Sequence, residues 1–203
     1  MIKIQADFLP SEIAEQLHID ILNTPEEWWR RTYMVENNCT THQNTIFERS
    51  LDWEAQLTNS LRQGKMTYQF TRSVEHKEGC SCYECELKKY AASEMKEVVE
   101  KETGIAGLEL AESFISVYER GDFLSTHTDK GKGDVAFVLN LTKGWKPEYG
   151  GLFHSQRQYV TPTFNSLIIM TLEDGGQNHF VSEVSQRATH SRLAFSGWYK
   201  KSK

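Results

Sequence analysis

The stretch "FLSTHTDKG" at residues 123–131 places a histidine and an aspartate two positions apart, between an apolar segment and a Gly/Lys turn. In an extended strand, residues two positions apart point to the same side of the sheet. His127 and Asp129 should therefore project one imidazole and one carboxylate toward a common point. A pair of this kind is more often a hydrogen-bonded structural feature than a metal site, so a metal requires a third ligand.

His179 is the candidate for the third ligand. It opens the apolar alternation "HFVSEV" at residues 179–184, directly after the turn-rich "EDGGQN" at residues 173–178. Two imidazoles and one carboxylate form the facial triad that holds Fe(II) and leaves coordination positions open. An oxygenase needs such open positions for a cosubstrate and O2. The sequence therefore predicts one iron ion at His127, Asp129 and His179.

Length and composition are those of an ordinary globular domain. The chain has 203 residues, of which 38% are hydrophobic and 25% are charged, so we expect residues 1–203 to form a single domain. The net charge of -5 and the lack of a basic stripe argue against a nucleic-acid partner or an anionic membrane surface. No apolar run is long enough to span a membrane, and the start of the chain lacks a signal-peptide core, so a cytoplasmic location is expected.

Helical periodicity dominates the first half of the chain. The pattern predicts helices over residues 11–22, 48–64 and 84–104, with Ser11 as a plausible N-cap and Gly104 as the last terminator. The predicted apolar faces consist of Ile13, Leu17 and Ile21; Leu51, Ala55 and Leu61; and Leu87, Tyr90, Ala91, Val98 and Val99.

Short β-type segments divided by turn residues follow Gly104. They cover residues 112–118, 134–141, 150–155, 157–162, 165–172, 179–185 and 190–199. Strands of this length and spacing indicate an antiparallel sandwich or barrel. The sequence thus predicts an α+β protein, mainly β, in which a helical part (1–104) buttresses a β core (105–203).

The second half of the chain resembles the 2-oxoglutarate- and Fe(II)-dependent oxygenases, specifically their prolyl-4-hydroxylase-like branch. The matching segments follow the family's order: "SVYERGDFLSTHTD" (116–129), "FVLNLTKGWKPEYGGLFHS" (137–155), "PTFNSLIIM" (162–170), "HFVSEV" (179–184) and "RLAFSGWY" (192–199). The resemblance implies a double-stranded β-helix, or jelly roll, with N-terminal helices, which agrees with the pattern above.

The resemblance also implies a role for Arg192. It matches the basic residue that pairs with the far carboxylate of 2-oxoglutarate, while His127, Asp129 and His179 match the iron ligands. The planar guanidinium suits a carboxylate, and an unpaired arginine inside so apolar a segment would be costly to bury. Arg187 is a rival, but it lies in the Ser/Gln/Thr-rich connection before this segment.

Other positions leave alternatives open. Tyr118 resembles the family tyrosine that adds a hydrogen bond to the same carboxylate, but it lies one residue nearer the histidine than usual and equally fits a core aromatic. Trp198 matches an aromatic residue behind the cosubstrate pocket, a position that packing alone also explains. Gly150 and Gly151 resemble the turn that starts a jelly-roll strand, which is a backbone role.

The activity implied by the resemblance is hydroxylation of an unactivated C–H with O2, with 2-oxoglutarate converted to succinate and CO2. Asp129 is present, which disfavours the halogenating variants that replace this carboxylate with a small residue. The expected substrate is amino-acid-like: a prolyl residue in a protein or peptide, or a free amino acid. The alternative is a non-catalytic or differently metallated cupin-like binding module, which requires neither Arg192 nor the Tyr118 segment.

A second ligand-rich stretch, "EHKEGCSCYECEL", covers residues 75–87. His76, Cys80, Cys82 and Cys85 make a Cys3His set of the kind that binds structural zinc. The C-x-C spacing is less usual than C-x2-C for such sites, so reduced surface thiols are the alternative. A metal here would fix a loop that could shape the substrate mouth.

Overall fold

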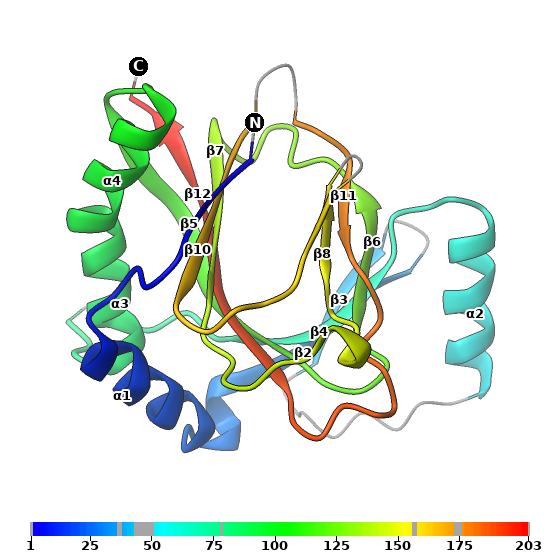
Figure 1. Cartoon of the computed structure of the whole chain (residues 1–203). Helices are drawn as coiled ribbons and strands as arrows, with labels where there is room; N and C mark the ends of the chain where they lie inside the picture. Colours follow the sequence, from blue (N-terminus) through cyan, green and yellow to red (C-terminus); the bar gives the residue numbers. More distant parts are fainter. Residues whose placement is uncertain are drawn as a thin grey trace.

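Twelve antiparallel strands form one curled sheet whose two halves face each other (Figure 1). The computed structural model describes residues 2–35, 38–42, 51–77, 79–155, 158–172 and 176–202. The strands are β1 (Ile2–Gln5), β2 (Trp29–Val35), β3 (Asn38–His42), β4 (Tyr68–Ser73), β5 (Leu108–Tyr118), β6 (Phe123–His127), β7 (Val135–Asn140), β8 (Phe153–Ser155), β9 (Gln158–Val160), β10 (Ser166–Thr171), β11 (His179–Val181) and β12 (Arg192–Lys201).

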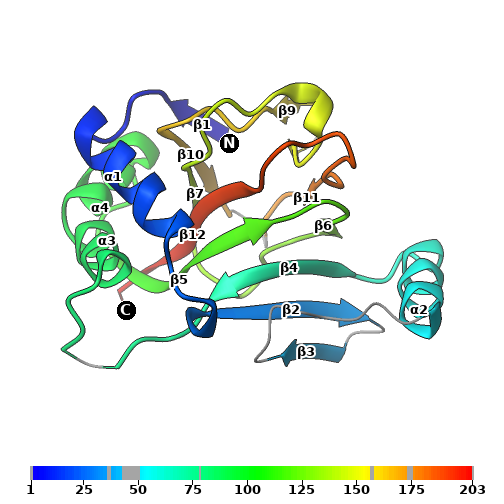
Figure 2. The same cartoon turned by 90° about the horizontal axis from the view of Figure 1, so that it is seen from below.

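The strand order explains the jelly roll. It runs β1-β10-β7-β12-β5-β4-β6-β11-β8-β9, and β4 pairs with both β5 and β6, so it joins the two halves of the sheet. The strands β2 and β3 extend the sheet beyond β4 (Figure 2). This curled antiparallel sheet confirms the predicted fold class, a mainly β protein with a double-stranded β-helix core.

Helices cover the outer face of one half of the sheet. The helices are α1 (Ser11–Leu22), α2 (Leu51–Arg62), α3 (Tyr83–Ala92) and α4 (Glu94–Thr103), and short 3-10 turns lie at Glu26–Trp28 and Pro147–Tyr149. Helices α1, α3 and α4 lie against this face, whereas α2 lies at the opposite end of the molecule (Figures 1 and 2). No helix in the described ranges is long and apolar enough to cross a bilayer.

Two hydrophobic clusters divide the interior. Along β12, Leu193, Phe195 and Tyr199 belong to the cluster shared with the helices, which is closed by a 2.6 Å hydrogen bond from the Tyr199 hydroxyl to the Ala91 carbonyl. Side chains of the other parity in β12 face the space between the two halves of the sheet, as the two-residue period of a strand requires. The helical buttress and the β core are therefore packed as the sequence predicts.

The first half of the chain is nevertheless not purely helical, because it contributes β1, β2, β3 and β4. The strands β2 ("WRRTYMV") and β4 ("YQFTRS") contain many charged and polar residues, so they lack the hydrophobic alternation by which a strand is predicted. Arg31, for example, is buried in β2, because it has a buried acidic partner. The part up to residue 104, predicted to be mainly helical, thus also contains four strands that the pattern did not predict.

The helix predictions need three corrections. The helix expected over residues 84–104 is broken at Ser93, whose φ of -120° and ψ of -94° separate α3 from α4. Helix α1 has the predicted bounds, but Pro10 takes the N-cap position instead of Ser11. Ile13 is 51% exposed, and Ala14 is buried in its place on the inner face. Gly104 ends α4 with a φ of +74°, as predicted. Parts of three predictions lie outside the described residues: 48–50 of the second helix, 157 of one strand and 173–175 of the turn before His179.

A buried ion pair ties β2 to the turn that precedes β6. Arg31 Nη1 donates to Asp122 Oδ2 at 2.7 Å, and Arg31 Nη2 pairs with Asp122 Oδ1. The same carboxylate accepts the backbone N–H of Glu119 at 2.8 Å. This bidentate pair fixes the chain immediately before the strand that ends in His127.

Removing the carboxylate should destabilise the fold strongly. In an Asp122→Ala variant, Arg31 keeps a buried charge without its acid, so the free energy of unfolding should fall by about 3–5 kcal/mol. Chemical denaturation measures this change. The exposed pair between Lys3 and Glu102 provides the control, because Glu102→Ala should cost less than about 1 kcal/mol. Equal losses in the two variants would contradict the structural importance of the buried pair.

Candidate active site

Two neighbouring strands bring the predicted metal ligands together. In the antiparallel pair of β6 and β11, His127 lies directly opposite His179. Asp129 Oδ1 is 3.5 Å from His127 Nε2, and Asp129 Oδ2 is 3.3 Å from His179 Nε2. One ligand atom from each of the three side chains lies within 4.8 Å of the others. The three side chains therefore form one compact group of nitrogen and oxygen ligands.

Backbone carbonyls fix the orientation of both imidazoles. His127 Nδ1 lies 2.9 Å from the Ser125 carbonyl oxygen, and His179 Nδ1 lies 2.9 Å from the Gln177 carbonyl oxygen. A carbonyl only accepts, so each Nδ1 carries the proton and donates it. In the neutral rings each Nε2 then keeps its lone pair and faces the group, which is the tautomer that a metal requires.

Burial and the mutual contacts set the charges of the group. Burial opposes the ionisation of Asp129, but the close contacts with the His127 and His179 rings outweigh it and hold the pKa of Asp129 well below its usual value. Burial by itself lowers the pKa of His179, yet the Asp129 carboxylate raises this pKa overall. The group thus presents one permanent carboxylate charge, and a cation is the natural counterpart to it.

The predicted geometry was correct in its outcome and wrong in one detail. Strand β6 ends at His127, so Asp129 lies beyond the strand and not within it. Its carboxylate reaches the common point from the turn, where the Lys132 N–H is 3.0 Å from the Asp129 carbonyl. The convergence therefore depends on the turn after β6 as well as on strand periodicity.

Arg192 is a buried cation at the start of β12. Its exposed fraction is 2%, and its guanidinium carbon lies 5.1 Å from the ring centroid of Tyr118, its neighbour on β5. Its Nε has no hydrogen-bond partner, and no aspartate or glutamate within the described ranges forms an ion pair with it. Burial lowers the pKa of Arg192, which expresses the cost of keeping this charge out of water.

The tight turn before β8 leaves room for this arginine. Gly151 has a φ of +60°, and a Cβ atom there would lie 3.2 Å from Arg192 Cδ and 3.1 Å from Val184 Cγ2. Gly150 has a φ of +68°, and its Cβ would lie 2.0 Å from the Glu183 carbonyl oxygen. Both glycines are therefore in conformations and spaces that other residues do not tolerate.

One pocket between the two halves of the sheet contains the three predicted metal ligands and the arginine. It is lined by Phe70, Phe114, Ser116, Tyr118, Leu124, His127, Asp129, Ala136, Phe137, Val138, Phe153, Ile168, Met170, His179, Val181, Arg192, Ser196, Gly197 and Trp198. Arg187 is exposed and is not among these residues, whereas Arg192 is. Sequence analysis missed Phe70, because it lies on the unpredicted strand β4.

Tyr118 and Trp198, for which the sequence leaves two roles possible, also line the pocket. Tyr118 is buried, and its ring stacks on Phe70 with centroids 5.1 Å apart. Burial raises the pKa of Tyr118, so its hydroxyl remains neutral. The indole Nε1–H of Trp198 is buried without a hydrogen-bond partner and is a free donor beside the pocket.

The second predicted ligand set also comes together, but at a different place. One ligand atom from each of His76, Cys80, Cys82 and Cys85 lies within 4.8 Å of the others. None of these four residues lines the pocket, so the structure does not support the expected role in shaping the substrate mouth.

The curled sheet therefore holds a His–Asp–His group and a buried arginine in one interior pocket. Residues 113–200 match the 2OG-Fe(II) oxygenase superfamily, and this segment contains all three ligands and Arg192. This match confirms the resemblance seen in the sequence and supports a 2-oxoglutarate-dependent dioxygenase, a family that uses O2 as cosubstrate. No curated protein sequence matches the chain.

Solved structures of two prolyl hydroxylases and of HygX share the fold. A prolyl-4-hydroxylase from Pseudomonas putida is 19% identical, covering 100% of this chain and 93% of its own, with a TM-score of 0.65. A prolyl hydroxylase from Trichoplax adhaerens, in complex with a hypoxia inducible factor peptide fragment, is 15% identical over 98% and 83%, with a TM-score of 0.59. HygX from Streptomyces hygroscopicus, with nickel and 2-oxoglutarate bound, is 9% identical over 99% and 83%, with a TM-score of 0.60.

Loss of one ligand should remove the iron. Asp129→Ala takes away the only carboxylate of the group, so we expect the variant to retain no Fe(II) after gel filtration, as measured by metal analysis. His154→Ala is the matched control, because His154 stacks on Phe180 on the strands next to the site but does not line the pocket. Full iron retention by the Asp129 variant would refute the assignment.

Loss of Arg192 should weaken the binding of 2-oxoglutarate and leave iron binding unchanged. Truncating one partner of a buried hydrogen-bonded charge pair costs about 2–5 kcal/mol, or roughly a thirty-fold to several-thousand-fold loss of affinity. Arg192→Ala should show this loss in anaerobic calorimetry, whereas the exposed Arg187→Ala should bind the cosubstrate normally. If Arg187→Ala shows the larger loss, the choice between the two arginines is wrong.

Proposed function

We propose that this enzyme hydroxylates an unactivated C–H of an amino-acid-like substrate, with Fe(II) on His127, Asp129 and His179 and 2-oxoglutarate on Arg192. The observation that carries the proposal is the buried guanidinium without an acidic partner among the described residues, in the same pocket as the ligand group. A dianionic cosubstrate that reaches from metal to arginine would supply the missing charge.

The donor set fits the metal. Two neutral imidazole Nε2 atoms and one carboxylate are the ligands of an iron centre that keeps open positions. When bound, Fe(II) would activate O2, which is the oxidant that converts 2-oxoglutarate to succinate and CO2. One oxygen atom of O2 then ends in succinate and the other in the product hydroxyl.

The surrounding side chains would orient the cosubstrate and exclude water. Arg192 would hold the far carboxylate, and the buried Tyr118, its neighbour on β5, would offer a neutral O–H donor beside it. The pocket walls also include the apolar residues Phe114, Ile168 and Met170, so the charge pair would form in a poorly solvated space.

The proposed substrate is a prolyl residue in a peptide or protein, or a free amino acid. On the strands β6 and β11 and on the neighbouring β8, the pocket walls include the apolar side chains of Leu124, Val181 and Phe153. Such walls suit a hydrocarbon ring better than a charged group. The fold shared with prolyl hydroxylases supports the proposal of a prolyl substrate.

The cupin-like binding module is the weaker candidate. The match to the oxygenase superfamily covers the ligand group, and a non-catalytic module gives no reason for a buried Arg192. We further propose that residues 1–203 act as one domain, because the helices share a hydrophobic cluster with the β core. Zinc at the Cys3His group is a separate proposal, since those residues lie outside the pocket.

Oxygen labelling tests the reaction class. Incubation with Fe(II), 2-oxoglutarate, 18O2 and a panel of prolyl peptides and amino acids should give succinate together with a product that gains one labelled oxygen atom, detected by mass spectrometry. Asp129→Ala should give neither. Turnover without 2-oxoglutarate, or product oxygen that comes from water, would end the oxygenase assignment and revive the binding-module alternative.

A further inference from the structure

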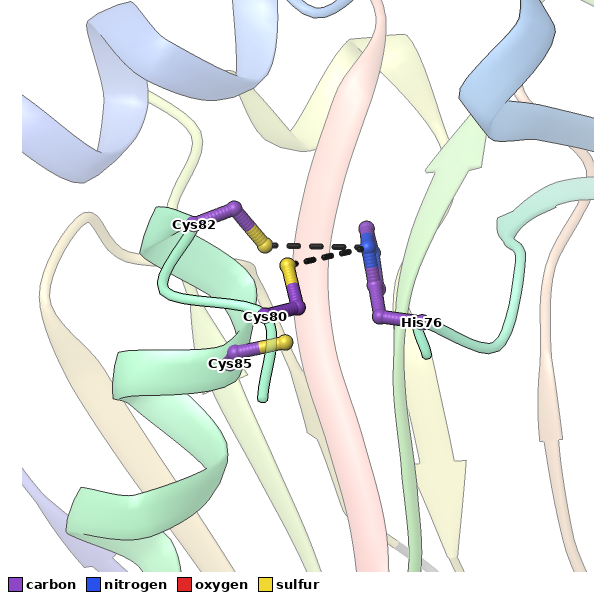
Figure 3. A group of neighbouring side chains, drawn as sticks. All are labelled: His76, Cys80, Cys82 and Cys85. Atoms are coloured by element: carbon purple, nitrogen blue, oxygen red, sulfur yellow. Dashed lines mark hydrogen bonds between the residues drawn. The ribbon is translucent and has the colours of Figure 1, made fainter. Parts of the chain in front are cut away.

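The connection between β4 and α3 holds the second ligand group. His76 lies three residues after the end of β4, Cys82 is the N-cap residue of α3, and Cys85 lies in the first turn of that helix. Figure 3 shows the three sulfur atoms pointing toward one another and toward the His76 ring. All three cysteines are free of disulfide bonds.

The distances within the group are those of a tetrahedral metal site. His76 Nδ1 is 3.7 Å from Cys80 Sγ and 3.7 Å from Cys82 Sγ. Zinc bonds of about 2.3 Å to sulfur and about 2.0–2.1 Å to nitrogen, at tetrahedral angles, separate such ligand atoms by roughly 3.5–3.8 Å. Cys85 Sγ lies within 4.8 Å of the other three ligand atoms. The group thus needs only a small contraction to close around an ion.

The histidine is oriented by a buried carboxylate. His76 Nε2 is 3.2 Å from Glu84 Oε2, and Glu84 is fully buried. With Nε2 donating its proton to Glu84, Nδ1 keeps its lone pair and faces the sulfur atoms. A histidine held between a metal and a carboxylate is the usual outer-shell arrangement of protein zinc sites.

Glu84 is itself held in place. Ser73 Oγ donates to Glu84 Oε1 at 2.8 Å and accepts the backbone N–H of Ile115 in β5 at 3.0 Å. Lys88 Nζ lies 2.8 Å from Glu84 Oε1. The carboxylate therefore links the group to the strands of the core, and His76 is further enclosed by an edge-on contact with Trp28 at 4.8 Å.

We propose that His76, Cys80, Cys82 and Cys85 bind one structural Zn²⁺, with Glu84 as the residue that positions His76. Reduced surface thiols would need neither a buried carboxylate behind the histidine nor four ligand atoms directed at one point. The ion would fix the end of β4 to the start of α3, and so would join the sheet to a helix that covers it. Thiolates select zinc over the iron of the pocket, so the two metal sites remain chemically distinct.

Metal analysis and cobalt substitution test the zinc site on the full chain. Protein purified under reducing conditions should contain one zinc per chain besides iron. Replacement of that zinc by Co²⁺ should give the intense absorption of a tetrahedral cobalt thiolate. Cys82→Ser should lose both the zinc and the absorption, whereas Ser81→Ala, an exposed neighbour in the same loop, should keep both.

The second variant separates positioning from ligation. Glu84→Gln should keep the cobalt absorption but weaken zinc binding by about 10–100-fold in competition with a chelator. Asp129→Ala should leave zinc binding unchanged, which distinguishes this site from the pocket. If the Cys82 variant does not fold, the cobalt spectrum of the unmodified chain still decides. Reduced protein that takes up neither zinc nor cobalt at this group would overturn the proposal.

Discussion

The register between β6 and β11 is the constraint on which the candidate site depends. It places His127 directly opposite His179, and a shift by one residue would turn one of the two imidazoles to the other face of the sheet. The backbone carbonyls of Ser125 and Gln177 then set the tautomer of both rings. The buried pair of Arg31 and Asp122 fixes the chain just before β6, so a contact outside the pocket helps to hold this register.

The burial of the Arg192 guanidinium destabilises the folded protein. A guanidinium that is 2% exposed and has no acidic partner among the described residues is costly in the free protein. Its backbone is held by pairing with Tyr118 of β5, and from Ala194 onward β12 also pairs with β7. We interpret this cost as preparation for an anionic cosubstrate, whose binding would relieve it.

Much of the β half could be predicted because its signals are local. The apolar alternation of residues 105–203 indicates the strands, and the spacing of His127, Asp129, His179 and Arg192 matches a known family. The strands β2 and β4 could not be predicted, since the burial of Arg31 depends on Asp122, which lies 91 residues away. Likewise the break at Ser93 and the carboxylate behind His76 depend on tertiary contacts that periodicity does not record.

The central claim is that one pocket binds Fe(II) and 2-oxoglutarate together, between the ligand group and Arg192. An anaerobic crystal structure of the protein with both added tests it most directly. The account predicts iron bonded to His127 Nε2, His179 Nε2 and the Asp129 carboxylate, with the far carboxylate of 2-oxoglutarate on the Arg192 guanidinium. Iron bound elsewhere, or a cosubstrate carboxylate that does not contact Arg192, would contradict the account.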